Sequence, residues 1–113
     1  NIFGSPTSAM SLAQAINHFL LEYRIDSHEN FNMIYHFAGE GRVSRYEYLC
    51  EITSLINNKF NLQNTVIKVP NSFFQLKAPR PQDTSLNSSL FSKTFAHSSQ
   101  PWRFSLSETI NLL

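Results

Sequence analysis

The 113-residue sequence is poor in cysteine and in long apolar runs. Cys50 is the only cysteine, so no disulfide can form within the chain, and a reducing cytoplasm is the simplest compartment for it. No apolar run approaches the ~18 residues of a membrane-spanning helix, and no signal peptide is visible. The four histidines are widely separated and lack metal-ligand spacing. We therefore expect no membrane partner and no metal site.

Charged residues are also scarce, at 15% of the chain, and the formal net charge is only +1. The nine lysines and arginines are scattered, whereas nucleic-acid binding needs a clustered basic stripe, so we expect no nucleic-acid partner. Hydrophobic residues make up 42% of the sequence, which indicates one globular domain over residues 1–113. Ten phenylalanines suggest either a phenylalanine-rich core or an apolar face that packs against something outside the chain.

Catalytic and phosphate-binding motifs are missing as well. No Ser/His/Asp or Cys/His order suggests a nucleophile, so we expect no catalytic residue. The sequence Gly39-Glu40-Gly41 lacks the third glycine of the dinucleotide-binding fingerprint G-x-G-x-x-G. The turn leads into an expected helix N-terminus at Ser44, where free amides could favour an anion. A plain strand-to-helix turn is the simpler interpretation.

Periodicity and turn residues predict a small α/β domain with short strands and flanking helices. Helices are expected at 8–24, 44–60 and 88–95 and at the C-terminus, a buried strand at 33–38, a second strand at 65–69, and loops at 4–7 and 26–32. The stretch 70–85 is proline-rich and should be neither helix nor central strand.

Two capping boxes predict where two of the expected helices begin, and two apolar faces predict which residues these helices bury. Ser44 and Glu47 form one box, and Ser105 and Glu108 form another that should open the last helix. Cys50 is expected to be a small core hydrophobe, and Trp102 to pack the last helix. The inner faces should comprise Tyr48, Leu49, Ile52, Leu55 and Ile56 on helix 44–60, and Leu106, Ile110 and Leu113 on the last helix.

Arg80 is the strongest candidate for anion binding. Its guanidinium offers a rigid fork of donors suited to two phosphate oxygens, and the prolines at 79 and 81 restrict the backbone on both sides. The alternative is that Arg80 pairs with Asp83 and only braces its loop. Lys77 and Lys68 are weaker candidates for the same anion, and a solvated surface lysine is the simpler interpretation of each.

Five segments resemble, in the same order, the C-terminal domain of the dTDP-4-dehydrorhamnose reductase family, which are extended short-chain dehydrogenase/reductases acting on nucleotide sugars. They are Gly4, Pro6 and Thr7 of a loop motif, Tyr35 to Gly39, Ser44 and Tyr46 at a helix start, Arg80-Pro81 with Leu86-Asn87, and Pro101-Trp102. Asn1, Ile2 and Arg45 depart from the family pattern, so the exact sugar nucleotide stays open.

The resemblance implies a substrate-binding domain whose catalytic Rossmann half is absent from this chain. Short-chain reductases protonate their substrate through a Tyr with a Lys four residues later, and no tyrosine here has that partner. The parent enzyme would use NAD(P)H to reduce a 4-keto group on a dTDP-linked deoxysugar, in dTDP-L-rhamnose biosynthesis. This chain would bind no cofactor itself and would hold the nucleotide sugar through Arg80, Lys77 and Thr7.

Other identities stay open at this point. The chain could belong to another nucleotide-sugar reductase or epimerase, or to a non-catalytic regulatory homologue such as the methionine adenosyltransferase β subunit. An independent small binding domain is a third possibility. Because a Rossmann partner would cover apolar surface, we expect Phe3, Phe73 and Phe74 to form an exposed patch or to be buried in a contact between copies of the chain.

Overall fold

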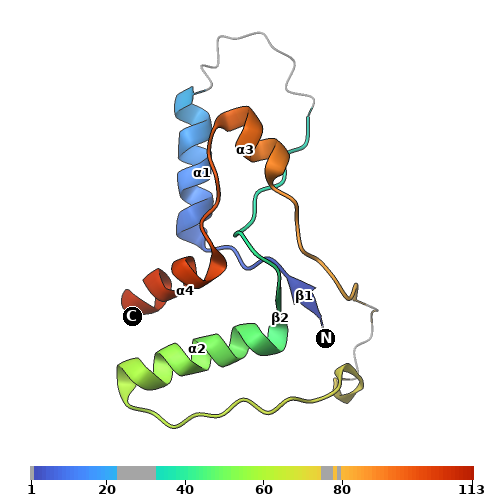
Figure 1. Ribbon diagram of the computed structural model, residues 1–113, viewed down its shortest axis with the longest axis vertical. Helices are drawn as coiled ribbons and strands as arrows, with labels where there is room; N and C mark the ends of the chain where they lie inside the picture. Colours follow the sequence, from blue (N-terminus) through green and yellow to red (C-terminus); the bar gives the residue numbers. More distant parts are fainter. Residues whose placement is uncertain (1, 23–32, 75–77, 79) are drawn as a thin grey trace.

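The computed structural model describes residues 2–22, 33–74, 78 and 80–113 (Figure 1). Two very short strands and four α-helices make up the domain, in line with the expected α/β class. The elements are β1 (Phe3–Gly4), α1 (Ala9–Glu22), β2 (Val43–Ser44), α2 (Arg45–Phe60), the 3-10 helix η1 (Asn71–Phe73), α3 (Ser89–Phe95) and α4 (Trp102–Asn111). The predicted loop at 26–32 lies outside the described residues.

Helix α2 begins and ends where local side chains satisfy its backbone. The Ser44 hydroxyl accepts from the Glu47 amide at 3.2 Å, and the Glu47 carboxylate accepts from the Ser44 amide at 3.1 Å. This confirms the predicted capping box. At the other end, Asn61 adopts a left-handed conformation with φ 53°, which stops the helix. Lys59 then donates to the carbonyls of Ile110 and Asn111 and ties α2 to the end of α4.

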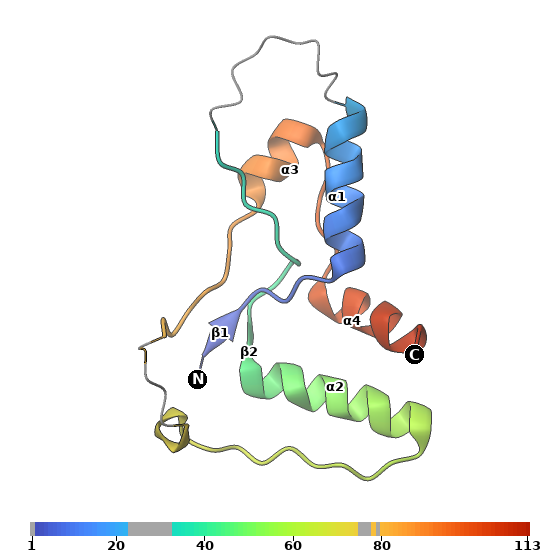
Figure 2. The same cartoon turned by 180° about the vertical axis from the view of Figure 1, so that it is seen from behind.

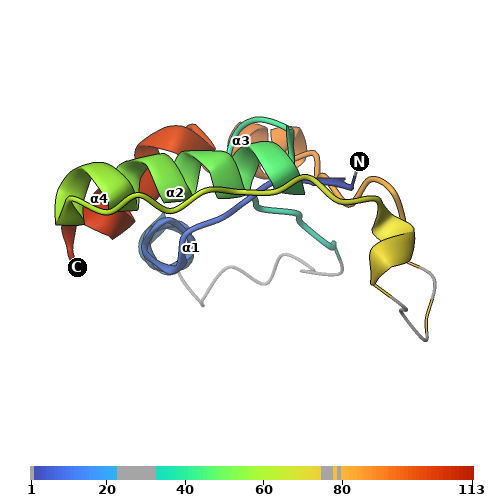
Figure 3. The same cartoon turned by 90° about the horizontal axis from the view of Figure 1, so that it is seen from below.

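Two separate apolar clusters hold the helices together. One lies where β2, α2 and α4 meet, and the other where α1 packs beside α3 (Figure 2). Viewed from below, α1 is seen end-on while α2 runs across the view, so the two helices cross rather than align (Figure 3). The buried members are Val43, Trp102, Leu106 and Ile110 in the first cluster, and Ala15, Phe91 and Phe95 in the second.

The second cluster is largely aromatic. The rings of Phe91 and Phe95 lie 4.8 Å apart between centroids, and Tyr35 and Phe37 meet them edge-on. Edge-to-face aromatic pairs stabilise a core beyond the area that they bury. Part of the phenylalanine excess therefore forms a core. Phe73 and Phe74 are 68% and 55% exposed, so another part faces water as expected.

The predicted strands at 33–38 and 65–69 are wrong. Residues 33–39 are extended but bond to side chains instead of a strand: the Ala38 amide donates to the Ser88 hydroxyl. Residues 62–70 run beside α2 (Figure 1) without regular structure, and Ile67 is 80% exposed. The strands form instead at Phe3–Gly4, whose second residue belongs to the expected loop at 4–7, and at Val43–Ser44, and the two pair antiparallel. A ladder needs a backbone partner, and tertiary placement brings one to Phe3–Gly4 and Val43–Ser44, whereas the predicted strands have none among the described residues.

The last helix also begins earlier than predicted. It starts at Trp102, with Pro101 in the cap position, so Ser105 is buried in the helix interior and the second capping box does not form. Leu106 and Ile110 are buried as expected, and Trp102 is 5% exposed. Leu113, at 72% exposed, faces water, because α4 ends at Asn111 before another turn could carry it inward.

Three further expectations need correction. Leu49 is 50% exposed, because the α2 face that meets α4 carries Tyr48, Ile52, Leu55 and Ile56 instead. Cys50 is half-buried rather than in the core, and its hydrogen bond with Tyr46 raises the pKa of that tyrosine above its ordinary value. One turn of 3-10 helix, η1, interrupts the stretch 70–85.

Within the described residues, no helix is both long and apolar enough to span a membrane.

Candidate functional site

The segment that carries Arg80 is anchored on β1. The Phe3 amide donates to the carbonyl of Gln82 at 2.8 Å, and the Thr84 amide and hydroxyl both donate to the Phe3 carbonyl at 3.0 Å. Phe3 and Asp83 thereby form a parallel bridge beside the β1–β2 pair. The chain leaving Arg80 thus joins β1 as a short third extended segment.

Asp83 lies at the centre of this junction. Its carboxylate accepts from the amide and hydroxyl of Ser85 at 3.0 and 2.6 Å, and from Nε of Arg42 at 2.6 Å. The hydrogen bonds from Ser85, followed by the one from Arg42, lower the pKa of Asp83 to about 2. The carboxylate is therefore ionised across the physiological pH range, and both of its oxygens already accept hydrogen bonds from Ser85 or Arg42.

Arg80 is consequently not the partner of Asp83. It is exposed and makes no hydrogen bond or ion pair with any residue that the structure describes. The interpretation that Arg80 braces its loop through Asp83 is wrong, because Arg42 performs that role. Among the described residues, none of the five guanidinium donors of Arg80 has a partner.

Thr7 lies shortly after β1 in the sequence and holds the loop that follows the strand. Its hydroxyl donates to the Ser5 carbonyl at 3.1 Å and accepts from the Gly39 amide at 3.0 Å. A hydroxyl has one donor and two lone pairs, so one lone pair remains for a further donor. Thr7 therefore orders the loop and could still accept one hydrogen bond.

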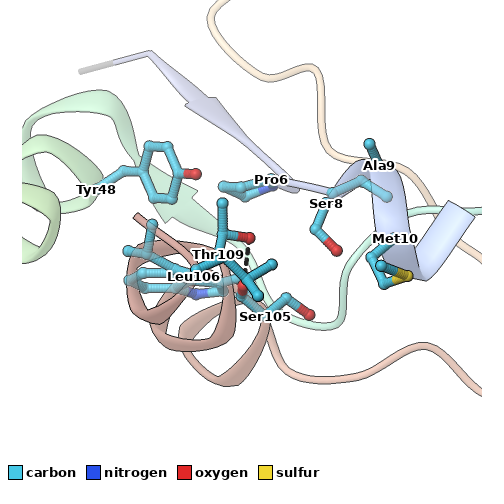
Figure 4. A pocket seen from close by; sticks show the side chains of 11 residues that line it. Pro6, Ser8, Ala9, Met10, Tyr48, Ser105, Leu106 and Thr109 are labelled. Carbon is cyan, nitrogen blue, oxygen red and sulfur yellow. Dashed lines mark hydrogen bonds between the residues drawn. The ribbon is translucent and has the colours of Figure 1, made fainter.

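Two cavities open beside this loop. The larger, about 420 Å³, lies between the start of α1, the first turns of α2 and the face of α4 (Figure 4). The Tyr48 hydroxyl points into it toward Pro6 and makes no hydrogen bond within the described part of the chain. The smaller, about 300 Å³, lies where β1, β2, Arg45 and Thr84 meet, next to the anchored Arg80 segment.

The N-terminus of α2 is already occupied by the protein. The Glu47 carboxylate accepts from the Ser44 hydroxyl and amide, and these two bonds lower the pKa of Glu47 below its ordinary value. A second anion at the same amides would meet this negative charge. The alternative of a free anion site at Ser44 is therefore not supported, in contrast to the simpler interpretation as a turn that leads into a helix.

The glycines of the Gly39–Gly41 turn serve packing. A Cβ on Gly39 would collide with the carbonyl oxygen of Pro6, and one on Gly41 would lie 2.9 Å from Cδ1 of Trp102. Protein atoms fill the space that a phosphate-binding loop leaves for a pyrophosphate. The Gly39–Gly41 turn therefore does not fit the pyrophosphate of a dinucleotide.

The remaining candidates are not gathered at this site. The ammonium of Lys68 lies 5.4 Å from the centroid of the Tyr46 ring, on the extended segment beside α2. Lys77 lies outside the described residues. In the described ranges, no three histidine, cysteine, aspartate or glutamate side chains come together as metal ligands.

Comparison with known proteins assigns the family. A model of the RmlD substrate-binding domain matches residues 2–113. The chain belongs to the RmlD substrate-binding domain family. This confirms the resemblance that the five segments indicated.

A solved structure supports the same family and fold. This RmlD substrate-binding domain is similar to dTDP-4-dehydrorhamnose reductase from Yersinia enterocolitica, with 28% sequence identity and a TM-score of 0.74. The similarity covers 97% of this chain and 35% of that chain, so this chain spans about a third of that length. No match was found among curated proteins.

Arg42 is the site residue that sequence reasoning missed. Its partner Asp83 lies 41 residues away, and its guanidinium stacks 3.6 Å above the Phe3 ring. An isolated arginine in a turn carries no pattern that predicts either contact. The sequence feature that could have pointed to an ion pair here was Asp83, just after the Arg-Pro segment, but its position in the sequence favoured Arg80 as the partner.

Proposed function

We propose that this chain binds the nucleotide-sugar substrate of an NAD(P)H-dependent dTDP-4-dehydrorhamnose reductase, in dTDP-L-rhamnose biosynthesis in the cytoplasm. The observation that carries the proposal is the similarity to the Yersinia reductase across 97% of this chain. In this proposal a Rossmann domain supplies the cofactor and the proton donor, and this chain contributes no catalytic residue.

Arg80 is proposed to bind the diphosphate. Its guanidinium is exposed and unpaired among the described residues, on a backbone that hydrogen bonds hold to β1. Arginine forks meet two phosphate oxygens at once, which fixes orientation as well as affinity. Lys77, three residues earlier, is proposed as a second cation for the same group.

Thr7 is proposed to accept a hydrogen bond from the substrate. Its hydroxyl already orders the loop at 5–7 and retains one lone pair. Hydroxyl groups are the donors that a deoxysugar offers. Substrate positioning of this kind raises the rate by orienting the reacting carbon, while hydride transfer itself belongs to the NAD(P)H that the Rossmann domain would hold.

Reductase activity of the complete protein that contains this chain tests the proposal. We expect NAD(P)H oxidation that depends on dTDP-4-dehydro-L-rhamnose, followed by cofactor absorbance. Boiled enzyme and omission of the sugar nucleotide are the controls. Binding of the sugar nucleotide without turnover would favour a non-catalytic homologue, and absence of both binding and turnover would overturn the proposal.

A further inference from the structure

Arg42 joins three segments that are distant in the sequence. Its guanidinium lies 3.6 Å from the centroid of the Phe3 ring in β1, and its Nε donates to Asp83 at 2.6 Å. Arg42 itself directly precedes β2. One side chain therefore clamps β1 and the Asp83 segment onto the start of β2. We call this contact set, Arg42, Phe3 and Asp83, the arginine clamp.

The clamp lies at the anchored segment that directly follows Arg80 in the sequence. The Phe3 amide bonds to the carbonyl of Gln82, and Asp83 and Thr84 follow in register. Arg80 lies two residues before Gln82, within about 7 Å along an extended backbone. The direction in which the Arg80 side chain leaves the domain is thus set by the backbone that the clamp holds.

The clamp is well suited to positioning and poorly suited to binding the ligand itself. Asp83 is anionic and would repel a phosphate, and it neutralises the guanidinium of Arg42 at 2.6 Å. Arg42 is engaged on one face by Phe3. Arg80, like Arg45 at the smaller cavity, is left as a cation whose side chain has no partner among the described residues.

We propose that Arg42 and Asp83 are positioning residues for phosphate recognition, holding the backbone from which Arg80 reaches the diphosphate of the substrate. This inference rests on the proposed function, in which Arg80 binds that diphosphate. A held backbone reduces the conformational freedom that the Arg80 fork must lose on binding. The clamp therefore affects ligands that carry phosphates and leaves the binding of an unphosphorylated nucleoside unchanged.

The experiment compares dTDP with thymidine in the complete protein that contains this chain. Affinities are measured by calorimetry for the wild type, Arg42→Ala, Arg80→Ala and the double variant. We expect Arg42→Ala to weaken dTDP binding about threefold to tenfold, in the range of couplings within one network, without changing thymidine binding. In the Arg80→Ala background, Arg42→Ala should cause no further loss, because the cation that it positions is gone.

Arg103→Ala is the matched control. Arg103 also stacks on an aromatic ring, 4.3 Å from Trp102, and also pairs with a carboxylate, Glu51 at 3.6 Å. It contacts α2 rather than the Arg80 segment, so its removal should leave dTDP binding unchanged. Arg42→Lys keeps the charge beside Phe3 and Asp83 and should restore part of the lost affinity, which a general loosening of the domain would not.

The outcomes separate the inference from the proposed function. If Arg80→Ala weakens dTDP binding while Arg42→Ala and Arg42→Lys do not, the clamp has no positioning role. The same conclusion follows if thymidine binding falls in parallel, or if the Arg42 and Arg80 effects simply add. If Arg80→Ala itself leaves dTDP binding unchanged, the diphosphate role of Arg80 is wrong, and the positioning inference falls with it.

Discussion

Gly41 lies directly against the indole ring of Trp102. A Cβ on Gly41 would be 2.9 Å from Cδ1 of that ring, and the residue has φ 102°, a conformation that side chains disfavour. Just before it, the Glu40 carbonyl accepts from the Trp102 amide at 3.0 Å. The start of α4 is thus fitted against a turn that needs glycine.

Replacing this glycine should destabilise the domain. We expect Gly41→Ala to lower the free energy of unfolding by about 1–3 kcal/mol, because it combines backbone strain with crowding of Trp102. Urea unfolding followed by tryptophan fluorescence measures the change. Gly4→Ala is the comparison and should cost less, since its Cβ would make a tight contact with the Thr84 hydroxyl at 3.3 Å but no positive φ is involved. Equal stabilities of Gly41→Ala and the wild type would show that the turn does not require glycine at this position.

The capping box of α2 gives a second prediction. Ser44→Ala removes the acceptor of the Glu47 amide in a buried position and should cost about 1 kcal/mol of unfolding free energy. Ser54→Ala, exposed on the same helix, should have little effect. Chemical denaturation of the two variants makes the comparison, and a similar loss in both would show that the cap is not responsible.

The same box should respond to acid. The folded-state pKa of Glu47 is lowered, so its contribution is fully present above the ordinary carboxyl pKa and is lost as pH falls through the lowered value. Glu47→Gln keeps a capping side chain without the charge. The wild type should therefore be more stable than Glu47→Gln at neutral pH, and the difference should vanish in acid. A difference that is independent of pH would exclude this origin.

Arg80 provides the test of diphosphate binding. Removal of a charge-assisted hydrogen bond should cost roughly 1.5–3 kcal/mol, which is roughly a tenfold to more than hundredfold loss of dTDP affinity. We expect Arg80→Lys to restore only part of it, because the fork geometry is lost. Titration of dTDP into the complete protein gives the affinities. Lys68→Ala, on the segment beside α2, serves as a neighbouring-cation control.

The 113-residue chain by itself should not reduce the substrate. The glycine turn is filled by Pro6 and Trp102, and no tyrosine has a lysine four residues later. The purified chain would be mixed with NAD(P)H and dTDP-4-dehydro-L-rhamnose, and cofactor absorbance followed. Turnover above the uncatalysed rate would overturn the division of roles between this chain and a Rossmann domain.

The exposed phenylalanines predict self-association of the chain. Phe73 and Phe74 are exposed and meet edge-on at 5.5 Å, whereas Phe3 is half-buried beneath Arg42 and is no longer a candidate. We expect Phe73→Ser with Phe74→Ser to weaken association measured by analytical ultracentrifugation. Phe104→Ser, exposed at 52% on α4, is the control. Unchanged association in the double variant would rule out this contact.

Short-range patterns were sufficient for most of the helices. The spacing of apolar residues located α1, α2 and α3, and the Ser44–Glu47 box located the start of α2 to the residue. These features depend on groups three or four positions apart, which a linear sequence displays directly. The family motifs are equally local, and the resemblance that they carried was confirmed by the family model.

The strands, the start of α4 and the arginine clamp depend on partners far along the chain. Phe3 is hydrogen-bonded to Thr84, 81 residues away, and Arg42 to Asp83, 41 residues away. No local sequence pattern around these residues predicts either contact. Segments 33–38 and 65–69 had the composition of strands, but neither pairs with a strand in the part of the chain that the structure describes. Hydrogen bonds of a sheet and ion pairs across a fold form only once packing brings the segments together, so folding of the whole domain selected Arg42 as the partner of Asp83 and left Arg80 exposed.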